Sequence, residues 1–163
     1  MSTTWKEEIE ALGGRASERA PLHFDDPGLE AQAAANGTIV SPLVDRVLIG
    51  LSGDQAESFL QTQLTCDVRG ATDSASIFGA YCSPKGRVIS VFRLFQWDGR
   101  YVLSLNADAA KTTEERLALY RMRTPVTIER LDDVASLGLA GPEAAPLLSD
   151  AGLPAPGPGQ AAG

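Results

Sequence analysis

The sequence is poor in the residues that most often build metal and nucleophilic sites. Its 163 residues contain one histidine, His23, and two cysteines, Cys66 and Cys82, which do not form a Cys-x-x-Cys pair. A four-ligand metal site would need carboxylates at unfavourable spacing. No histidine neighbours either cysteine in the sequence, so nothing supports a catalytic thiol. We therefore expect no bound metal, no disulfide, and two small semi-buried cysteines.

Other absences narrow the class of protein further. The sequence has no phosphate-cradling glycine loop, no Gly-x-Ser-x-Gly and no zinc-helix motif. It also lacks a run of 18 apolar residues, so no membrane span is expected. Residues 1–10 have no secretory apolar core and carry several acids, which leaves the cytoplasm as the expected location.

The charge balance argues against a free-standing nucleic-acid binder. Fourteen basic residues stand against 21 acidic ones, a net charge of −7. Proteins that bind nucleic acid usually neutralise phosphates with a basic face. We expect no direct nucleic-acid partner, although a local basic patch remains compatible with this composition.

Hydrophobic spacing predicts alternating strands and helices from about residue 45 onward. Strands are expected at residues 46–51, 75–82, 88–97, 101–105, 126–131 and 134–140, the last of them buried. Helices are expected after the capping residues 52–54, from about 107 to 123, and after residues 141–143. Three apolar helix stripes are predicted: Trp5, Ile9 and Leu12; Ala56, Phe59, Leu60 and Leu64; Ala110, Leu117 and Tyr120. Residues 15–38 show little periodicity and are predicted to form a loop with at most one helical turn.

Two turns fix the middle of the fold. Residues 83–86 (SPKG) fit a type I turn, with proline second and glycine fourth, and Asp98-Gly99 is a strong hairpin signal. The three strands around these turns should form an antiparallel meander. The predicted fold class is α+β, with helices on one face of an antiparallel sheet and a split β-α-β (ferredoxin-like) arrangement. The predicted divisions are an N-terminal helix and loop (1–44), the α+β domain (45–133), a second unit (134–154) and a tail (155–163).

Polar and cationic residues within this domain are candidates for ligand binding. Gln61, Gln63, Thr65 and Asp67 cluster at the end of the first main helix, where they either line a ligand channel or are simply solvated. Residues 85–87 (KGR) form a basic hairpin tip, which could hold an anion or be ordinary surface. Arg93 interrupts an apolar strand. Either the face of the strand that carries it is exposed to solvent, or its side chain is paired with an acid or binds an anion. Four aromatics could stack on a flat ligand ring, although such residues are more often core: Phe92, Phe95, Trp97 and Tyr101.

Two blocks carry a resemblance to a known family: residues 59–68 (FLQTQLTCDV) and residues 81–88 (YCSPKGRV). Their order and spacing resemble the start of the YgfZ-type folate-binding proteins, relatives of the aminomethyltransferase (T-protein) of the glycine cleavage system. The resemblance implies three domains around a central channel that holds tetrahydrofolate. It implies a folate-binding accessory role in iron–sulfur protein maturation and tRNA modification, with iron–sulfur client or assembly proteins as partners. Folate-binding positions carried over are Gln61, Gln63, Thr65, Asp67, Lys85, Gly86 and Arg93.

The sequence departs from the family pattern in three places. Residues 88–92 (VISVF) lack the acidic pair that serves folate chemistry in T-protein, which disfavours aminomethyl transfer and an enzymatic role. Arg46 stands where some members have a folate-contacting tryptophan. The family's Lys-Gly-Cys-(Tyr/Phe)-x-Gly-Gln-Glu segment is not reached, so the chain resembles an N-terminal portion with weak or no folate binding of its own. The alternatives are a tetrahydrofolate-dependent aminomethyltransferase and a ligand-free interaction module.

Overall fold

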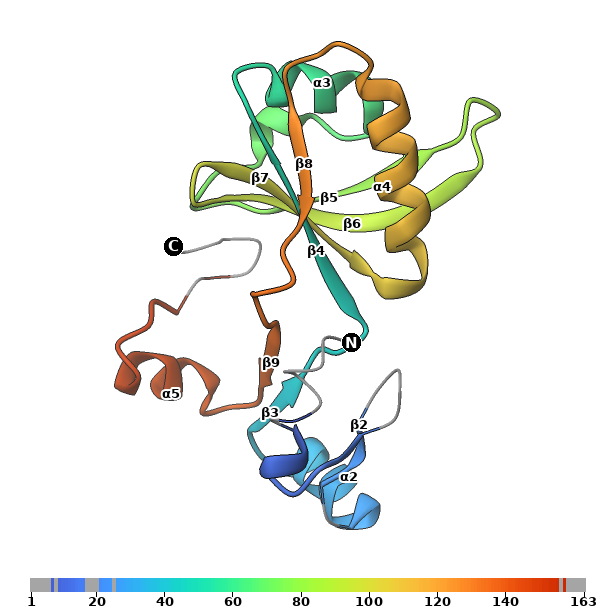
Figure 1. The fold of residues 1–163 in the computed structure, drawn as a ribbon. Helices are drawn as coiled ribbons and strands as arrows, with labels where there is room; N and C mark the ends of the chain where they lie inside the picture. The colour runs from blue at the N-terminus through green and yellow to red at the C-terminus, as the bar shows by residue number, and fades with distance from the viewer. Residues whose placement is uncertain (1–6, 8, 17–20, 25, 156, 158–163) are drawn as a thin grey trace. The chain divides into compact units, whose positions relative to one another are not determined.

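The computed structural model describes residues 7, 9–16, 21–24, 26–155 and 157 (Figure 1). The chain forms two compact units. The larger contains residues 46–131, and the smaller contains residues up to 45 together with residues 132–155. Segments that the sequence assigned to separate parts of the chain, 1–44 and 134–154, thus contribute to one unit.

The larger unit is built on a five-stranded antiparallel sheet with the order β5-β6-β7-β4-β8. Its strands are β4 (Arg46–Ser52), β5 (Ile77–Cys82), β6 (Val88–Trp97), β7 (Arg100–Asn106) and β8 (Thr127–Arg130). The predicted meander of β5, β6 and β7 is confirmed. Because β7 and β8 both pair antiparallel with β4, they run parallel to each other and are joined by helix α4 (Ala107–Arg121). This is the split β-α-β of the predicted α+β fold.

Both predicted turns close the meander. The Gly86 N–H donates to the Ser83 carbonyl oxygen at 2.9 Å, as a β-turn over residues 83–86 requires. Asp98 and Gly99 have φ values of 50° and 70°. Two successive positive φ values define a type I′ turn, whose twist matches that of the flanking strands.

One face of the sheet forms the hydrophobic core with α4 and helix α3 (Ala56–Gln63). The sheet contributes fully or almost fully buried side chains: Ile49, Leu51, Phe92, Leu94, Leu103 and Leu105. The predicted stripe of α3 is buried as expected, since Ala56, Phe59, Leu60 and Leu64 all belong to this cluster. We call this side of the sheet the covered face.

Two details of these helices differ from the prediction. The N-cap of α3 is Gln55, which makes no side-chain capping bond, so the prediction that residues 52–54 cap this helix is wrong. The chain turns there at Gly53, whose φ of 118° favours glycine. On α4, Thr113 is fully buried whereas Tyr120 is 41% exposed, so the predicted stripe fails at its last residue.

The smaller unit holds most of the structure that the sequence missed. Strands β1 (Arg15–Ala16) and β2 (Pro21–His23) pair, and helix α2 runs from Pro27 to Asn36, so the predicted loop at 15–38 is wrong. Asp26 caps α2 through the N–H groups of Gly28 and Leu29. Because α2 has no buried residue, it leaves no hydrophobic periodicity in the sequence.

The ends of the smaller unit also correct the prediction. Strand β3 (Ile39–Pro42) pairs antiparallel with β9 (Leu137–Ala140), followed by helix α5 (Ala144–Asp150). Leu137 is 61% exposed, so the strand expected to be buried lies at the surface. In the first helix Ile9 is buried but Leu12 is 74% exposed, and Trp5 lies outside the described residues.

Candidate functional site

The predicted polar cluster forms the corner between α3 and β5. The Gln61 side-chain oxygen accepts a hydrogen bond from the Val68 N–H at 2.8 Å. The Thr65 hydroxyl accepts from the Ala80 N–H at 2.9 Å, and the Thr65 N–H donates to the Ala80 carbonyl at 3.0 Å. The half-buried Gln63 contacts the neighbouring Thr62 hydroxyl at 3.2 Å. Gln61 and Thr65 thus hold the corner onto the sheet.

Asp67 continues this corner and caps the short 3₁₀ helix η1 (Val68–Gly70). Its carboxylate accepts from the Arg69 N–H at 3.3 Å and from the Arg69 Nε at 2.9 Å. These hydrogen bonds hold the pKa of Asp67 below its usual range. Both side chains are exposed, so the ion pair contributes little to stability.

Arg93 lies on the other side of the sheet from the core. Its guanidinium stacks over the Phe78 ring, 4.4 Å from the ring centroid, and donates to the Ser76 hydroxyl at 2.8 Å. Phe78 is 68% exposed and Val91 is 59% exposed. We call Phe78, Val91 and Arg93 the open-face patch. It is confined to β5 and β6, because Val102 on β7 is fully buried on the same face.

The open-face patch is apolar and cationic. The cross-strand neighbours of Arg93 are Phe78 and Ser104, and Val91 pairs with Ala80 on β5. None of these residues carries a carboxylate. In the segment 88–92, Val91 points to the open face whereas Ser90 is buried, with its hydroxyl 2.9 Å from the Thr113 hydroxyl. The segment 88–92 therefore places no carboxylate on the open face.

The predicted aromatic candidates divide between the two faces of the sheet. Phe95 is half-buried and pairs with Val102 on the open face. Phe92 is 1% exposed and belongs to the core, and the Tyr101 hydroxyl donates to a Glu57 carboxylate oxygen at 2.9 Å. Trp97 is 40% exposed at the end of β6. The most exposed aromatic side chain of the described residues is Phe78, which sequence reasoning missed. Phe78 and Tyr81 are three residues apart on β5, and side chains alternate between the two faces of a strand. Because Tyr81 points to the core, this spacing could have placed Phe78 on the opposite face.

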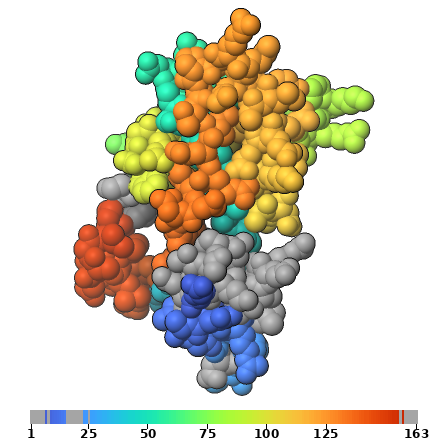
Figure 2. Space-filling model, viewed as in Figure 1, coloured from blue at the N-terminus to red at the C-terminus, as the bar shows by residue number. Residues whose placement is uncertain are grey.

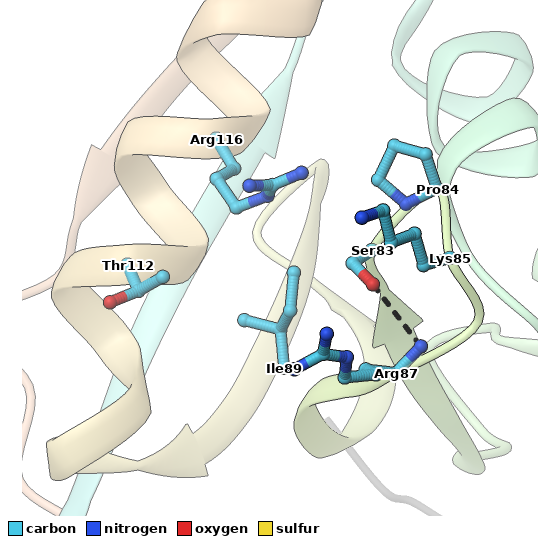
Figure 3. A pocket seen from close by; sticks show the side chains of 7 residues that line it. All are labelled: Ser83, Pro84, Lys85, Arg87, Ile89, Thr112 and Arg116. Carbon is cyan, nitrogen blue, oxygen red and sulfur yellow. Dashed lines mark hydrogen bonds between the residues drawn. The ribbon is translucent and has the colours of Figure 1, made fainter.

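The hairpin tip between β5 and β6 lies beside α4 (Figures 1 and 2). Lys85, Arg87 and Ile89 from the hairpin, with Thr112 and Arg116 from α4, line a pocket of about 430 Å³ (Figure 3). We call it the hairpin–α4 pocket. Arg93 lies five residues beyond Val88 on β6, which at about 3.3 Å per residue places it roughly 16 Å along the strand.

The seven predicted folate contacts are thus distributed over three places. Four form the α3–β5 corner, Lys85 and Gly86 belong to the hairpin tip, and Arg93 alone belongs to the open-face patch. The larger unit does not gather them into one cluster. Their assignment to folate stays a prediction.

The cysteines are both thiols, and burial raises the pKa of the Cys66 thiol. Within the part of the chain that the structure describes, no three histidine, cysteine or acidic side chains are grouped so that they could hold a metal ion. In the same residues no helix has the length and apolar character needed to cross a membrane.

Comparison with solved structures defines the class of fold. The glycine cleavage system aminomethyltransferase T from Bartonella henselae matches this chain with a TM-score of 0.77 and 22% sequence identity. The match covers 93% of this chain and 43% of that one. The chain therefore has the aminomethyltransferase T fold, which confirms the predicted fold class.

Comparison of sequences defines the family within that fold. The tRNA-modifying protein YgfZ of Photobacterium profundum is 37% identical over 123 residues, which is 76% of this chain and 37% of that protein. YgfZ of Klebsiella pneumoniae is 35% identical over 119 residues, covering 69% of this chain and 36% of that protein. No family model matches the sequence. The chain is a YgfZ-type sequence, as its two blocks predicted, and it spans little more than a third of the length of these relatives.

Proposed function

We propose that the larger unit of this chain supplies one wall of a folate site in a YgfZ-type accessory protein. The observation that carries the proposal is the open-face patch, where an exposed phenylalanine ring lies under an arginine on an otherwise uncovered part of the sheet. The role of the whole protein would be tRNA modification through maturation of iron–sulfur proteins. Iron–sulfur client or assembly proteins would be its partners.

The chemistry of the open-face patch fits the two ends of a folate. An exposed ring such as Phe78 offers a stacking surface for a flat heterocycle, and aromatic pairs contribute about 0.5–1.5 kcal/mol beyond area burial. The Arg93 guanidinium can form paired hydrogen bonds with a carboxylate, such as those of a glutamate tail. Its contact with Phe78 orients the guanidinium before a ligand arrives.

The patch supports binding rather than aminomethyl transfer. A transfer reaction needs a group that takes up or delivers a proton beside the folate. The exposed residues of the segment 88–92 are Val88 and Val91, and neither they nor Ala80, which pairs with Val91, ionise. This favours the accessory role over the aminomethyltransferase alternative.

Binding by this chain alone is expected to be weak. Small-molecule sites usually bury most of the ligand surface, which a single wall does not do. Exposed charge pairs contribute only about 0.2–1 kcal/mol each and weaken with salt. The proposal therefore predicts a dissociation constant for tetrahydrofolate no tighter than sub-millimolar. Gln61, Gln63, Thr65, Asp67, Lys85 and Gly86 remain further predicted contacts.

Calorimetric titration with tetrahydrofolate tests the proposal. Arg93→Ala and Phe78→Ala should each weaken binding severalfold. Each contact contributes about 1 kcal/mol, and about 1.4 kcal/mol would correspond to tenfold in affinity. Arg123→Ala removes another exposed cation, outside the open-face patch, and should leave the affinity unchanged. A micromolar dissociation constant that changes neither with salt concentration nor with either patch substitution would contradict the proposal. Undetectable binding up to about 10 mM ligand would favour the ligand-free interaction module instead.

A further inference from the structure

We propose that the hairpin–α4 pocket is a second ligand site, which binds the phosphate group of a small molecule. The pocket is separate from the open-face patch. It joins the tip of the β5–β6 hairpin to α4, the helix that packs on the covered face (Figure 3).

Three cationic side chains converge on the pocket. Lys85 and Arg87 come from the hairpin, and Arg116 comes from α4. Figure 3 shows the Arg116 guanidinium and the Lys85 ammonium extending toward one another from opposite sides. Like charges brought together repel one another, and an anion between them converts that repulsion into attraction. A net charge of −7 makes such a gathering of cations unusual for this chain.

No carboxylate neutralises these cations within the described residues. The ion pairs of the larger unit engage other partners, and the acids closest in sequence to Arg116 are both occupied. Glu114 pairs with Arg130, and Glu115 lies 4.0 Å from Lys111. The pocket is therefore ready to accept an anion from outside the larger unit.

Arg116 is the best-held of the three cations. Its guanidinium lies 5.9 Å from the Tyr120 ring centroid and is close enough to the Tyr81 hydroxyl to oppose the rise that burial causes in the pKa of Tyr81. Its Nε is buried and has no hydrogen-bond partner among the described residues. A buried donor without an acceptor is costly. The terminal guanidinium nitrogens of Arg116, rather than its Nε, would meet a bound anion.

A β-bulge gives the pocket its apolar wall. Tyr81 pairs with Ser90, and Cys82 pairs with Val88, so Ile89 is the extra residue on β6. Bulges re-aim side chains and often occur beside functional sites. Ile89 packs against the core cluster and lines the pocket, although simple alternation would place it on the same face as Val91.

The size and chemistry of the pocket fit a small organic phosphate. A volume of about 430 Å³ is within the usual range for small-molecule sites and larger than a phosphate ion needs. Ile89 offers apolar contact for the remainder of the ligand. The Ser83 hydroxyl at the rim accepts the Arg87 N–H at 3.1 Å, which leaves its own O–H to donate. An open pocket between one hairpin tip and one helix does not provide the extended basic face that a nucleic-acid backbone requires.

Titration of the full chain with pyrophosphate tests the site, with triglutamate as the carboxylate counterpart at matched ionic strength. We expect pyrophosphate to bind at least tenfold more tightly than triglutamate. Arg116→Ala should weaken pyrophosphate binding at least tenfold, and Arg116→Lys should weaken it less. Arg87→Ala, at an exposed hairpin position, should weaken it about threefold while leaving the fold intact by circular dichroism. Arg123→Ala and Arg93→Ala should leave it unchanged.

Other results overturn the inference. Pyrophosphate that fails to bind at about 10 mM, or binds equally well to Arg116→Ala and Arg87→Ala, rules out the site. Tighter binding of triglutamate would assign the pocket to a polycarboxylate. Binding of an RNA oligonucleotide that depends on Arg116 and exceeds that of pyrophosphate would replace the small-molecule assignment. Lys85 is named in both proposals, but Phe78 and Arg93, which carry the folate proposal, are not involved in this pocket. Failure here therefore leaves the open-face patch untouched.

Discussion

The two faces of the five-stranded sheet carry similar side chains in different surroundings. Phe92 on β6 is 1% exposed under the helices, whereas Phe78 on the neighbouring strand is 68% exposed on the other face. The covered face excludes water and stabilises the fold. The open face leaves an aromatic ring and a guanidinium accessible to solvent. These groups contribute little to the stability of the fold, but they are available to bind a ligand. Burial, rather than residue type, thus separates the residues that hold this unit together from those available to a ligand.

The largest expected difference between the faces concerns the two phenylalanines. Phe92→Ala should lower the free energy of unfolding by about 3–5 kcal/mol, because it removes a fully packed ring and leaves a cavity. Phe78→Ala should change it by about 0.5 kcal/mol or less, because the ring is already largely solvated. Urea denaturation followed by circular dichroism measures both. Equal losses for the two variants would mean that the open face is covered in solution.

A smaller difference is expected between polar contacts on the two faces. Thr113→Val leaves the buried Ser90 hydroxyl without its partner and should cost about 1–3 kcal/mol. Adding Ser90→Ala should restore part of that loss, a non-additivity that marks direct contact. On the open face, Ser76→Ala removes an exposed hydrogen bond to Arg93 and should cost about 0.5 kcal/mol or less. Additive losses for the buried pair would show that the hydroxyls do not depend on one another.

The smallest effect is expected at the exposed ion pair of the α3–β5 corner. Because Arg69 lowers the pKa of Asp67 in the folded state, this contact favours folding above the unfolded-state pKa of about 3.9. The contribution is lost as pH falls through the lower, folded-state value. Arg69→Ala should raise the Asp67 pKa toward its ordinary value in a carboxyl NMR titration, whereas Arg123→Ala should not. An unchanged Asp67 titration in Arg69→Ala would show that the pair does not persist in solution.

Local signals explain which parts of the fold could be predicted. The meander follows from two turns, and the buried side of α3 follows from its apolar spacing. Helix α2 was missed because it buries no side chain. Strand β3 was missed because its partner β9 lies about a hundred residues further along the chain, and no local sequence pattern indicates that the two strands pair.

The candidate site was less predictable, because its roles depend on contacts between distant residues. The polarity of Gln61 and Thr65 was visible, but their bonds to Val68 and Ala80 arise only when α3 meets β5. Arg93 stood out as a cation in an apolar strand, whereas its stacking on Phe78 required the register of β5 and β6. The approach of Arg116 to the hairpin tip has no counterpart in the sequence.

Mapping of tetrahydrofolate onto the backbone amides by NMR tests the proposed open-face site most directly. With isotopically labelled chain under anaerobic conditions, the account predicts that the largest shift changes surround Phe78 on β5 and Arg93 on β6. Amides of α4 should change little. Shift changes centred on α4, on the hairpin tip or on the smaller unit, with none around Phe78 and Arg93, would contradict the assignment of folate to the open face.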